Sequence, residues 1–146
     1  MDIVEEAVRR RDTIALADPE RAYPELKDLL ERRMDFDTVR EPKYYHDVDS
    51  GNVRSRIEAE VGFDKHTRGE IDIFLFIDAA DGELDIQVKG KVVTSYGDGK
   101  YDDALWYYGY RALYDKFVYG SVREQMKPEV EEKVEELLTR VRKSVS

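Results

Sequence analysis

The chain has 146 residues, with 33 acidic and 24 basic side chains and a formal net charge of −9. Charged residues make up 39% and hydrophobic residues 41% of the sequence, so we expect a folded core rather than general disorder. The acidic balance argues against nucleic acid or an anionic membrane as the main partner, because such surfaces are bound through clustered lysine and arginine. The absence of cysteine excludes disulfides, thiolate metal sites and cysteine nucleophiles, and we expect no metal or other cofactor.

The N-terminal residues lack a basic start followed by an apolar run, and the longest apolar stretch, residues 73–77, is far shorter than the roughly 20 residues that span a bilayer. We therefore expect a cytoplasmic protein without a membrane segment. No repeat or Gly/Ser-rich linker divides the chain, which predicts one domain over residues 1–146. Within it we expect a helical pair at 1–33, a sheet at 34–96 and C-terminal helices at 97–146.

Residues 2–16 predict an amphipathic helix, because apolar side chains recur between charged ones at helical spacing. These side chains are Ile3, Ala7, Val8 and Ile14. A second, shorter helix is expected to begin at Pro24, since proline is tolerated in the first helical turn. Its buried stripe would be Leu26, Leu29 and Leu30.

The next segment changes to a period of two, which is typical of strands. Turn signals divide it into four strands, within residues 36–48, 53–63, 69–79 and 83–96. The turns are expected at Ser50-Gly51, at residues 64–68 and at Asp81-Gly82. The cross-strand pairs that they predict are Tyr44 with Ile57, Val61 with Ile71, and Ile77 with Ile86. All three turns place the apolar side chains on one inner face of an antiparallel meander.

The opposite face of the predicted sheet is mostly charged, with three exceptions. Phe74, Phe76 and Val93 point outward from central strands, where an exposed sheet prefers polar groups. We therefore expect these three side chains to be covered. Two covers are open: the N-terminal helix pair, or a second subunit, in which case the three residues form the interface of a homo-oligomer.

After the sheet, a helix is predicted over residues 103–119, with acidic residues at its start and Gly120 at its end. One arc of this helix is aromatic and would cover the inner face of the sheet; its members include Trp106, Tyr110 and Phe117. A final helix is expected to start or kink at Pro128 and to bury Val130, Val134, Leu137 and Val141. The predicted fold class is thus α+β, a four-stranded antiparallel meander with two helices at each end, in the order α-α-β-β-β-β-α-α.

The candidate binding site lies between the sheet and the aromatic helix. Ala59 and Gly90 flank Ile73 in one cross-strand row of the predicted register, so the middle of the inner face carries little side-chain volume. If the aromatic side chains fill this row, it is the seat of the helix. If they bridge over it, they leave a pocket for an apolar or aromatic small molecule. The residues that would line this pocket are Tyr44, His46, Tyr96, Trp106 and Tyr110.

Catalytic patterns are scarce in the sequence. Residues 47–58 match part of a calcium loop, but Asn52 stands where that loop requires its sharp-turn glycine. His46 is the only histidine on the inner face and could act as an acid or base, although no nucleophile or carboxylate is fixed beside it. A small enzyme that uses His46, tyrosines and carboxylates stays an alternative.

A helix laid over an antiparallel meander resembles the helix-grip ligand-binding folds, and the meander followed by helices is similar in outline to the export chaperone SecB. The chain departs from both: helix-grip folds have more strands and insert helices after the first strand, and SecB lacks the N-terminal helix pair. No motif carries residues across from either. We predict a noncatalytic, homo-oligomeric binding or interaction domain, with a chaperone-like or adaptor role through the sheet or the acidic surface as the alternative.

Overall fold

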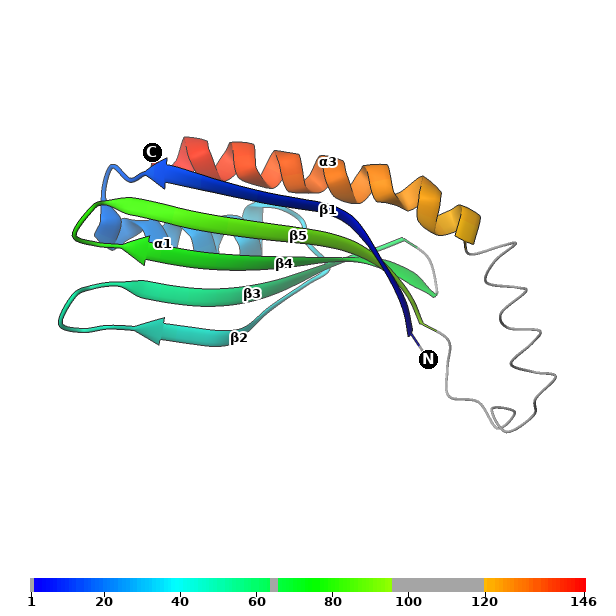
Figure 1. The fold of residues 1–146 in the computed structure, drawn as a ribbon, viewed down its shortest axis with the longest axis horizontal. Coiled ribbons are helices and arrows are strands. Elements are labelled where there is room, and N and C mark those ends of the chain that lie inside the picture. Colours follow the sequence, from blue (N-terminus) through cyan, green and yellow to red (C-terminus); the bar gives the residue numbers. More distant parts are fainter. Residues whose placement is uncertain (1, 64–65, 96–119) are drawn as a thin grey trace.

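The computed structural model describes residues 2–63, 66–95 and 120–146, which form a five-stranded antiparallel sheet in the order β1-β5-β4-β3-β2 (Figure 1). The strands are β1 (Asp2–Ala15), β2 (Thr38–His46), β3 (Val53–Gly62), β4 (Thr67–Asp78) and β5 (Glu83–Ser95). The helical elements are α1 (Pro19–Asp28), a π-helical turn η1 (Leu29–Arg33), and α3 (Gly120–Val145). They pack on one face of the sheet, called the inner face here, and the opposite outer face is turned toward the viewer in Figure 1. None of the described helices is both long and apolar enough to cross a bilayer.

The predicted fold class is wrong, because residues 2–15 form strand β1 instead of a helix. This strand pairs with β5 and becomes one edge of the sheet. The described part of the chain therefore has five strands, one short N-terminal helix and one long C-terminal helix. The predicted aromatic helix over residues 103–119 lies outside the described residues.

A β-bulge explains why β1 has the apolar spacing of a helix. Glu6 pairs with Lys91 and Val8 pairs with Gly90, so Ala7 is an extra residue in this strand. The extra residue shifts the alternation of side chains by one position. Apolar residues on the two sides of the bulge therefore do not follow a period of two in the sequence.

Charged residues on the inner side of β1 interrupt the alternation of polar and apolar residues that identifies a strand. Arg10 and Asp12 lie on the inner side of β1 and form ion pairs with helix α3. Arg10 Nε is 2.8 Å from Glu135 Oε1, and the carboxylate of Asp12 accepts a hydrogen bond from Arg142. Polar residues thus occupy positions that alternation reserves for apolar ones, because their partners are on another element.

Helix α1 begins earlier than predicted. Asp18 is its N-cap and accepts a hydrogen bond from the Glu20 backbone N–H at 3.1 Å, and Pro19 occupies the first turn. Pro24 consequently lies inside the helix instead of at its start. The predicted apolar stripe is buried all the same; Leu26, Leu29 and Leu30 are at most 1% exposed.

All three hairpins differ from the predicted register by two residues. Tyr44 pairs with Ser55, Ile57 with Ile73, and Ile77 with Leu84. Because side chains alternate with a period of two, a shift of two residues leaves every side chain on its predicted face.

Longer turns cause the shift in two of these hairpins. Asp78 accepts a hydrogen bond from the Asp81 N–H at 3.1 Å, and Gly82 has a φ of 64°, which together close a four-residue turn at 79–82. In the first hairpin, Asp47 accepts from the Asp49 N–H at 3.0 Å within a six-residue loop. The side chains of the turn aspartates thus favour longer loops than the two-residue turns that were predicted.

Helix α3 packs tightly against the sheet at Gly90. In the observed register Ala59 and Gly90 flank Ile71, so the small-residue row is centred two residues from its predicted position. A Cβ atom added at Gly90 would lie 2.6 Å from Val130 Cγ1 and 2.8 Å from Val8 Cγ1. A helix therefore packs on the Gly90 end of this row, and that helix is α3. As predicted, α3 buries Val130, Val134, Leu137 and Val141.

We expect Gly90→Ala to destabilise the fold by about 1–3 kcal/mol, because the new methyl group would force Val130 or the whole helix to move. Chemical denaturation of the single variants and of Gly90→Ala/Val130→Ala measures this effect. Since Val130→Ala makes room for the methyl group, the double variant should lose less stability than the sum of the two single losses. Additive losses of stability, or an unchanged denaturation midpoint for Gly90→Ala, would contradict the close packing of α3 on Gly90.

Candidate functional site

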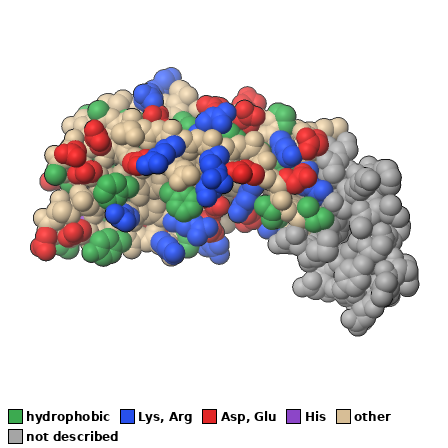
Figure 2. Space-filling view, in the orientation of Figure 1, with side chains coloured by type: hydrophobic (Ala, Val, Ile, Leu, Met, Phe, Trp, Pro, Cys, Tyr) green, Lys and Arg blue, Asp and Glu red, His purple; other side chains and the backbone are tan. Residues whose placement is uncertain are grey.

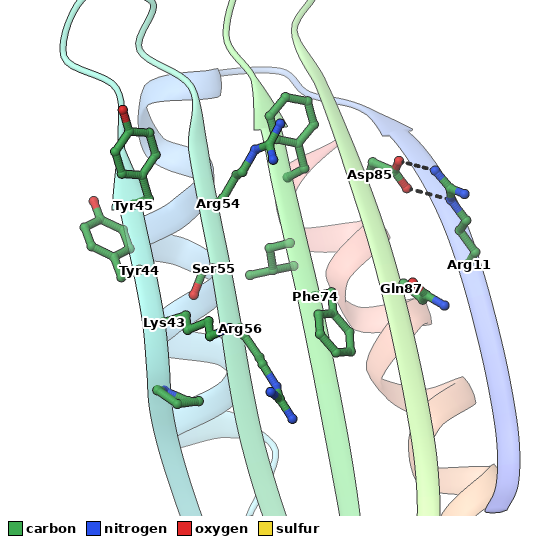
Figure 3. Close-up of a pocket in the computed structure, with 13 residues that line it drawn as sticks. Arg11, Lys43, Tyr44, Tyr45, Arg54, Ser55, Arg56, Phe74, Asp85 and Gln87 are labelled. Atoms are coloured by element: carbon green, nitrogen blue, oxygen red, sulfur yellow. Dashed lines mark hydrogen bonds and ion pairs between the residues drawn. The ribbon is translucent and has the colours of Figure 1, made fainter.

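An open groove of 780 Å³ crosses the outer face of the sheet. Its floor includes Phe74 and Phe76 of β4, which alternate with buried inner-face residues and so point away from the helices. Figure 3 shows Arg54 and Arg56 of β3 on one side of the floor and Gln87 of β5 on the other. All five strands contribute residues to the groove, so its geometry depends on the register of the whole sheet.

Cationic side chains lie over the two aromatic rings. Arg54 Cζ is 4.9 Å from the centroid of the Phe76 ring, and Arg56 Cζ is 5.4 Å from that of Phe74. Lys89 Nζ, from β5, lies 5.5 Å from the Phe74 centroid. These are cation–π distances. The two rings are half-buried, and the side chains that cover them belong to the sheet itself.

The N-terminal segment does not supply the predicted cover. Residues 2–15 belong to the sheet, and α1 packs on the inner face. The third predicted interface residue, Val93, is 1% exposed. Val93 is therefore already buried within the single chain. For Phe74 and Phe76, a second subunit as the cover stays a prediction.

The groove is basic although the chain is acidic. Four basic side chains line it, Arg11, Lys43, Arg54 and Arg56, against the single carboxylate of Asp85. The whole chain has a net charge of −9. In Figure 2, lysine and arginine side chains gather over the middle of this face, next to hydrophobic ones. Within the described part of the chain, neither Lys43 nor Arg54 forms an ion pair.

Arg56 has an unused hydrogen-bond donor. Its Nη2 atom lies 3.3 Å from Glu58 Oε1 and 4.0 Å from Asp72 Oδ1. Its Nε atom, in contrast, is buried and has no hydrogen-bond partner among the described residues. A buried donor without an acceptor is costly.

Beside the groove, the outer face carries a balanced ion-pair network. Its basic members are Arg40, Arg56, Arg68 and Lys91, and its acidic members are Glu58, Glu60, Glu70 and Asp72. Four positive charges here meet four negative ones. The excess of positive charge is therefore a property of the groove and not of the outer face as a whole.

The one carboxylate of the groove is engaged by Arg11. Arg11 donates to both oxygens of Asp85, at 3.1 and 2.6 Å, as the dashed lines in Figure 3 mark. These hydrogen bonds hold the pKa of Asp85 below its ordinary value and raise the pKa of Arg11. The pair is neutral overall, so this side of the groove is polar but not cationic. Among the described residues, no group of three or more side chains is arranged to hold a metal ion.

A second bulge shapes the β2 side of the groove. It lies between Arg40 and Lys43 and turns Glu41 toward the inner face. Glu41 accepts hydrogen bonds from the Tyr23 hydroxyl, at 2.6 Å, and from the Ser55 hydroxyl. Burial acts to raise the pKa of Glu41, but these hydrogen bonds outweigh burial and the pKa is lowered. Burial and the contact with Glu41 raise the pKa of Tyr23. The network fixes β2 against β3 and α1.

Only two of the five predicted pocket residues can be located. Tyr44 is 50% exposed, and its ring centroid lies 4.9 Å from that of Tyr23 in α1. His46 is exposed at the end of β2. Tyr44 pairs with Ser55, and Ser55 is four residues from Ala59 along β3. Tyr44 is therefore roughly 13 Å from the small-residue row that contains Ala59. The other three predicted residues, Tyr96, Trp106 and Tyr110, lie outside the described residues, and the pocket that they would complete stays a prediction.

Arg54 and Arg56 belong to the charged face of the predicted sheet, but no groove was predicted there. A signal for the groove was present: two outward phenylalanines in β4, at positions i and i+2, lie next to a strand with arginines at the same spacing. Arg54 pairs with Phe76 and Arg56 pairs with Phe74. The predicted register, two residues away, did not bring these pairs together.

The sequence matches no protein-family model and no curated protein. Nine chains of solved structures are similar to this one. One of them, described as "Crystal structure of Ara h 8.0201", is 12% identical, and the similarity covers 89% of this chain and 99% of that chain at a TM-score of 0.34. The function is therefore inferred from the chemistry of the described residues.

We expect Glu41→Gln to lower the free energy of unfolding at neutral pH by about 1–3 kcal/mol, because an amide is a poorer acceptor for two hydroxyl groups. The pKa of Glu41 in the folded chain lies below its ordinary value of 4.5. Its carboxylate therefore contributes fully above the ordinary pKa, and the contribution is lost as the pH falls through the folded pKa.

Denaturant titrations at several pH values check this expectation. The wild type should lose stability more steeply than Glu41→Gln between about pH 5 and pH 3. Glu25→Gln, at an exposed position of α1, serves as the control and should follow the wild type. Parallel pH profiles for Glu41→Gln and the wild type would show that the hydrogen-bond network does not depend on the carboxylate.

Proposed function

We propose that the protein is a binding domain for small aromatic anions and that the outer-face groove is its binding site. One observation carries the proposal: two outward aromatic rings lie beneath arginine side chains, of which Arg54 has no carboxylate partner among the described residues, in a chain of net charge −9. Most basic residues elsewhere on this face are paired. A positive excess beside an apolar floor is complementary to a ligand that combines an apolar ring with a negative charge.

Each part of such a ligand has a counterpart in the groove. A planar ring can stack on Phe74 or Phe76 and on the guanidinium planes above them. An anionic group can accept charge-assisted hydrogen bonds from Arg54, which has no ion-pair partner among the described residues. The guanidinium of Arg56 lines the groove beside it and adds positive charge. Since the groove is open to water, salt should weaken binding.

The proposal keeps the binding role predicted from the sequence and locates it on the other face of the sheet. On the inner face, valines of α3 occupy the Gly90 end of the row that was expected to border a pocket. Homo-oligomerisation through Phe74 and Phe76 is a separate prediction, which the molecular mass in solution tests; Val93, the third residue predicted for that interface, is buried within the single chain.

Isothermal titration calorimetry of the full chain with 1-naphthyl phosphate and with neutral 1-naphthol tests the proposal. The phosphate ester should bind more tightly than the alcohol, and its affinity should fall as salt is added. Arg54→Ala should weaken binding of the ester about tenfold or more, because a hydrogen bond to a charged group is lost. Phe76→Leu, which keeps an apolar side chain but removes the aromatic face, should weaken both compounds.

Arg9→Ala is the matched control, because Arg9 is an arginine of β1 that pairs with Glu6 and does not line the groove. It should bind both compounds as the wild type does. Equal affinity for ester and alcohol, or equal affinity of Arg54→Ala and the wild type for the ester, would refute the groove as an anion site.

A further inference from the structure

The register of the sheet arranges the groove into two parallel rows of side chains that run across the strands. From β2 to β1, the first row is Lys43, Arg56, Phe74, Gln87 and Arg11. The second row is Tyr45, Arg54, Phe76, Asp85 and Thr13. In both rows the aromatic ring lies in the middle, on β4. The residues on its two sides differ in kind.

One side of the groove is cationic and the other is a hydrogen-bonding edge. On β2 and β3, Lys43 and Arg54 have no ion-pair partner among the described residues. On β5, Gln87 is half-buried, and its amide makes no hydrogen bond within the described part of the chain. Arg11 and Asp85 neutralise each other next to it. An amide offers a donor and an acceptor side by side, which matches the edge of a heteroaromatic ring.

The spacing of the strands sets the size of a ligand that uses both sides. Neighbouring strands are about 4.8 Å apart. A ligand ring above β4 therefore lies about one strand spacing from β3 on one side and from β5 on the other. A ring with a hydrogen-bonding edge that carries a phosphate on its opposite side would reach both. A nucleotide has this form: a planar base with donor and acceptor atoms, and a phosphate joined through the sugar.

We infer that the ligand class of the groove is the nucleotide, held with its phosphate over β2 and β3, its base on Phe74, and its base edge at Gln87. This inference rests on the proposed function and deepens it. Arg54 and Arg56 hold the phosphate, and Gln87 is the residue that distinguishes a nucleotide from an aromatic phosphate without a polar edge. The amide can present its donor and acceptor to more than one base, so it selects the class and not a particular base.

Calorimetric titration of the full chain with adenosine monophosphate, ribose 5-phosphate and 1-naphthyl phosphate tests the inference. Adenosine monophosphate should bind most tightly, because it alone uses the cations, the ring and Gln87. Gln87→Met, which keeps the length of the side chain and removes its amide, should weaken adenosine monophosphate about tenfold and leave 1-naphthyl phosphate unchanged. Arg54→Ala should weaken the binding of all three phosphates.

If Gln87→Met unfolds at a lower temperature than the wild type, Gln87→Leu provides the second variant, since it also removes the amide and adds no charge. It too should weaken adenosine monophosphate. The inference is overturned if adenosine monophosphate binds no better than ribose 5-phosphate, or if Gln87→Met weakens both aromatic phosphates equally. In those cases binding of 1-naphthyl phosphate, sensitive to Arg54→Ala, would still support the proposed function. If 1-naphthyl phosphate does not bind either, the proposed function fails as well.

Discussion

Helix α3 can lie against the middle of the sheet because residue 90 has no side chain. Val130 and Val8 meet above Gly90, and a methyl group there would overlap both. This contact brings the apolar stripe of α3 onto β1, β5 and β4, where Val134 and Leu137 are completely buried. Arg10 of β1 then reaches Glu135 at the border of the helix. The helices thus cover the inner face, and the outer face, with Phe74 and Phe76, is left for a ligand.

Much of this arrangement follows from local sequence rules. The alternation in the four later strands identified their inner face correctly, although each turn was longer or shorter than predicted, because a register error of two residues does not exchange the faces of a strand. The stripe Val130, Val134, Leu137 and Val141 identified the face of α3 that is buried. Both inferences needed only the periodicity of a single element.

The first strand could not be recognised in this way, since its pattern depends on distant residues. Arg10 and Asp12 occupy inward positions only because Glu135 and Arg142, more than a hundred residues later, neutralise them.

The groove on the outer face was not predicted for a related reason. Phe74 and Phe76 were recognised as unusual, but the identity of the cations over them depends on the register between β3 and β4, which an error of two residues obscures. Burial of a side chain can be read from one segment, whereas its partners require the assembled sheet.

The two bulges have a consequence for how the sheet can associate. Both edge strands are irregular, β1 at Ala7 and β2 between Arg40 and Lys43, whereas β3, β4 and β5 pair with one another without a break. An edge strand exposes unpaired backbone N–H and C=O groups, to which a strand of another chain can hydrogen-bond. A bulge interrupts this row of groups. Pro42, within the second bulge, also lacks the N–H group that a ladder requires. The bulges therefore disfavour fibril-like growth by strand addition at both edges of the sheet. The central strands, in contrast, are long, apolar and rich in β-branched residues.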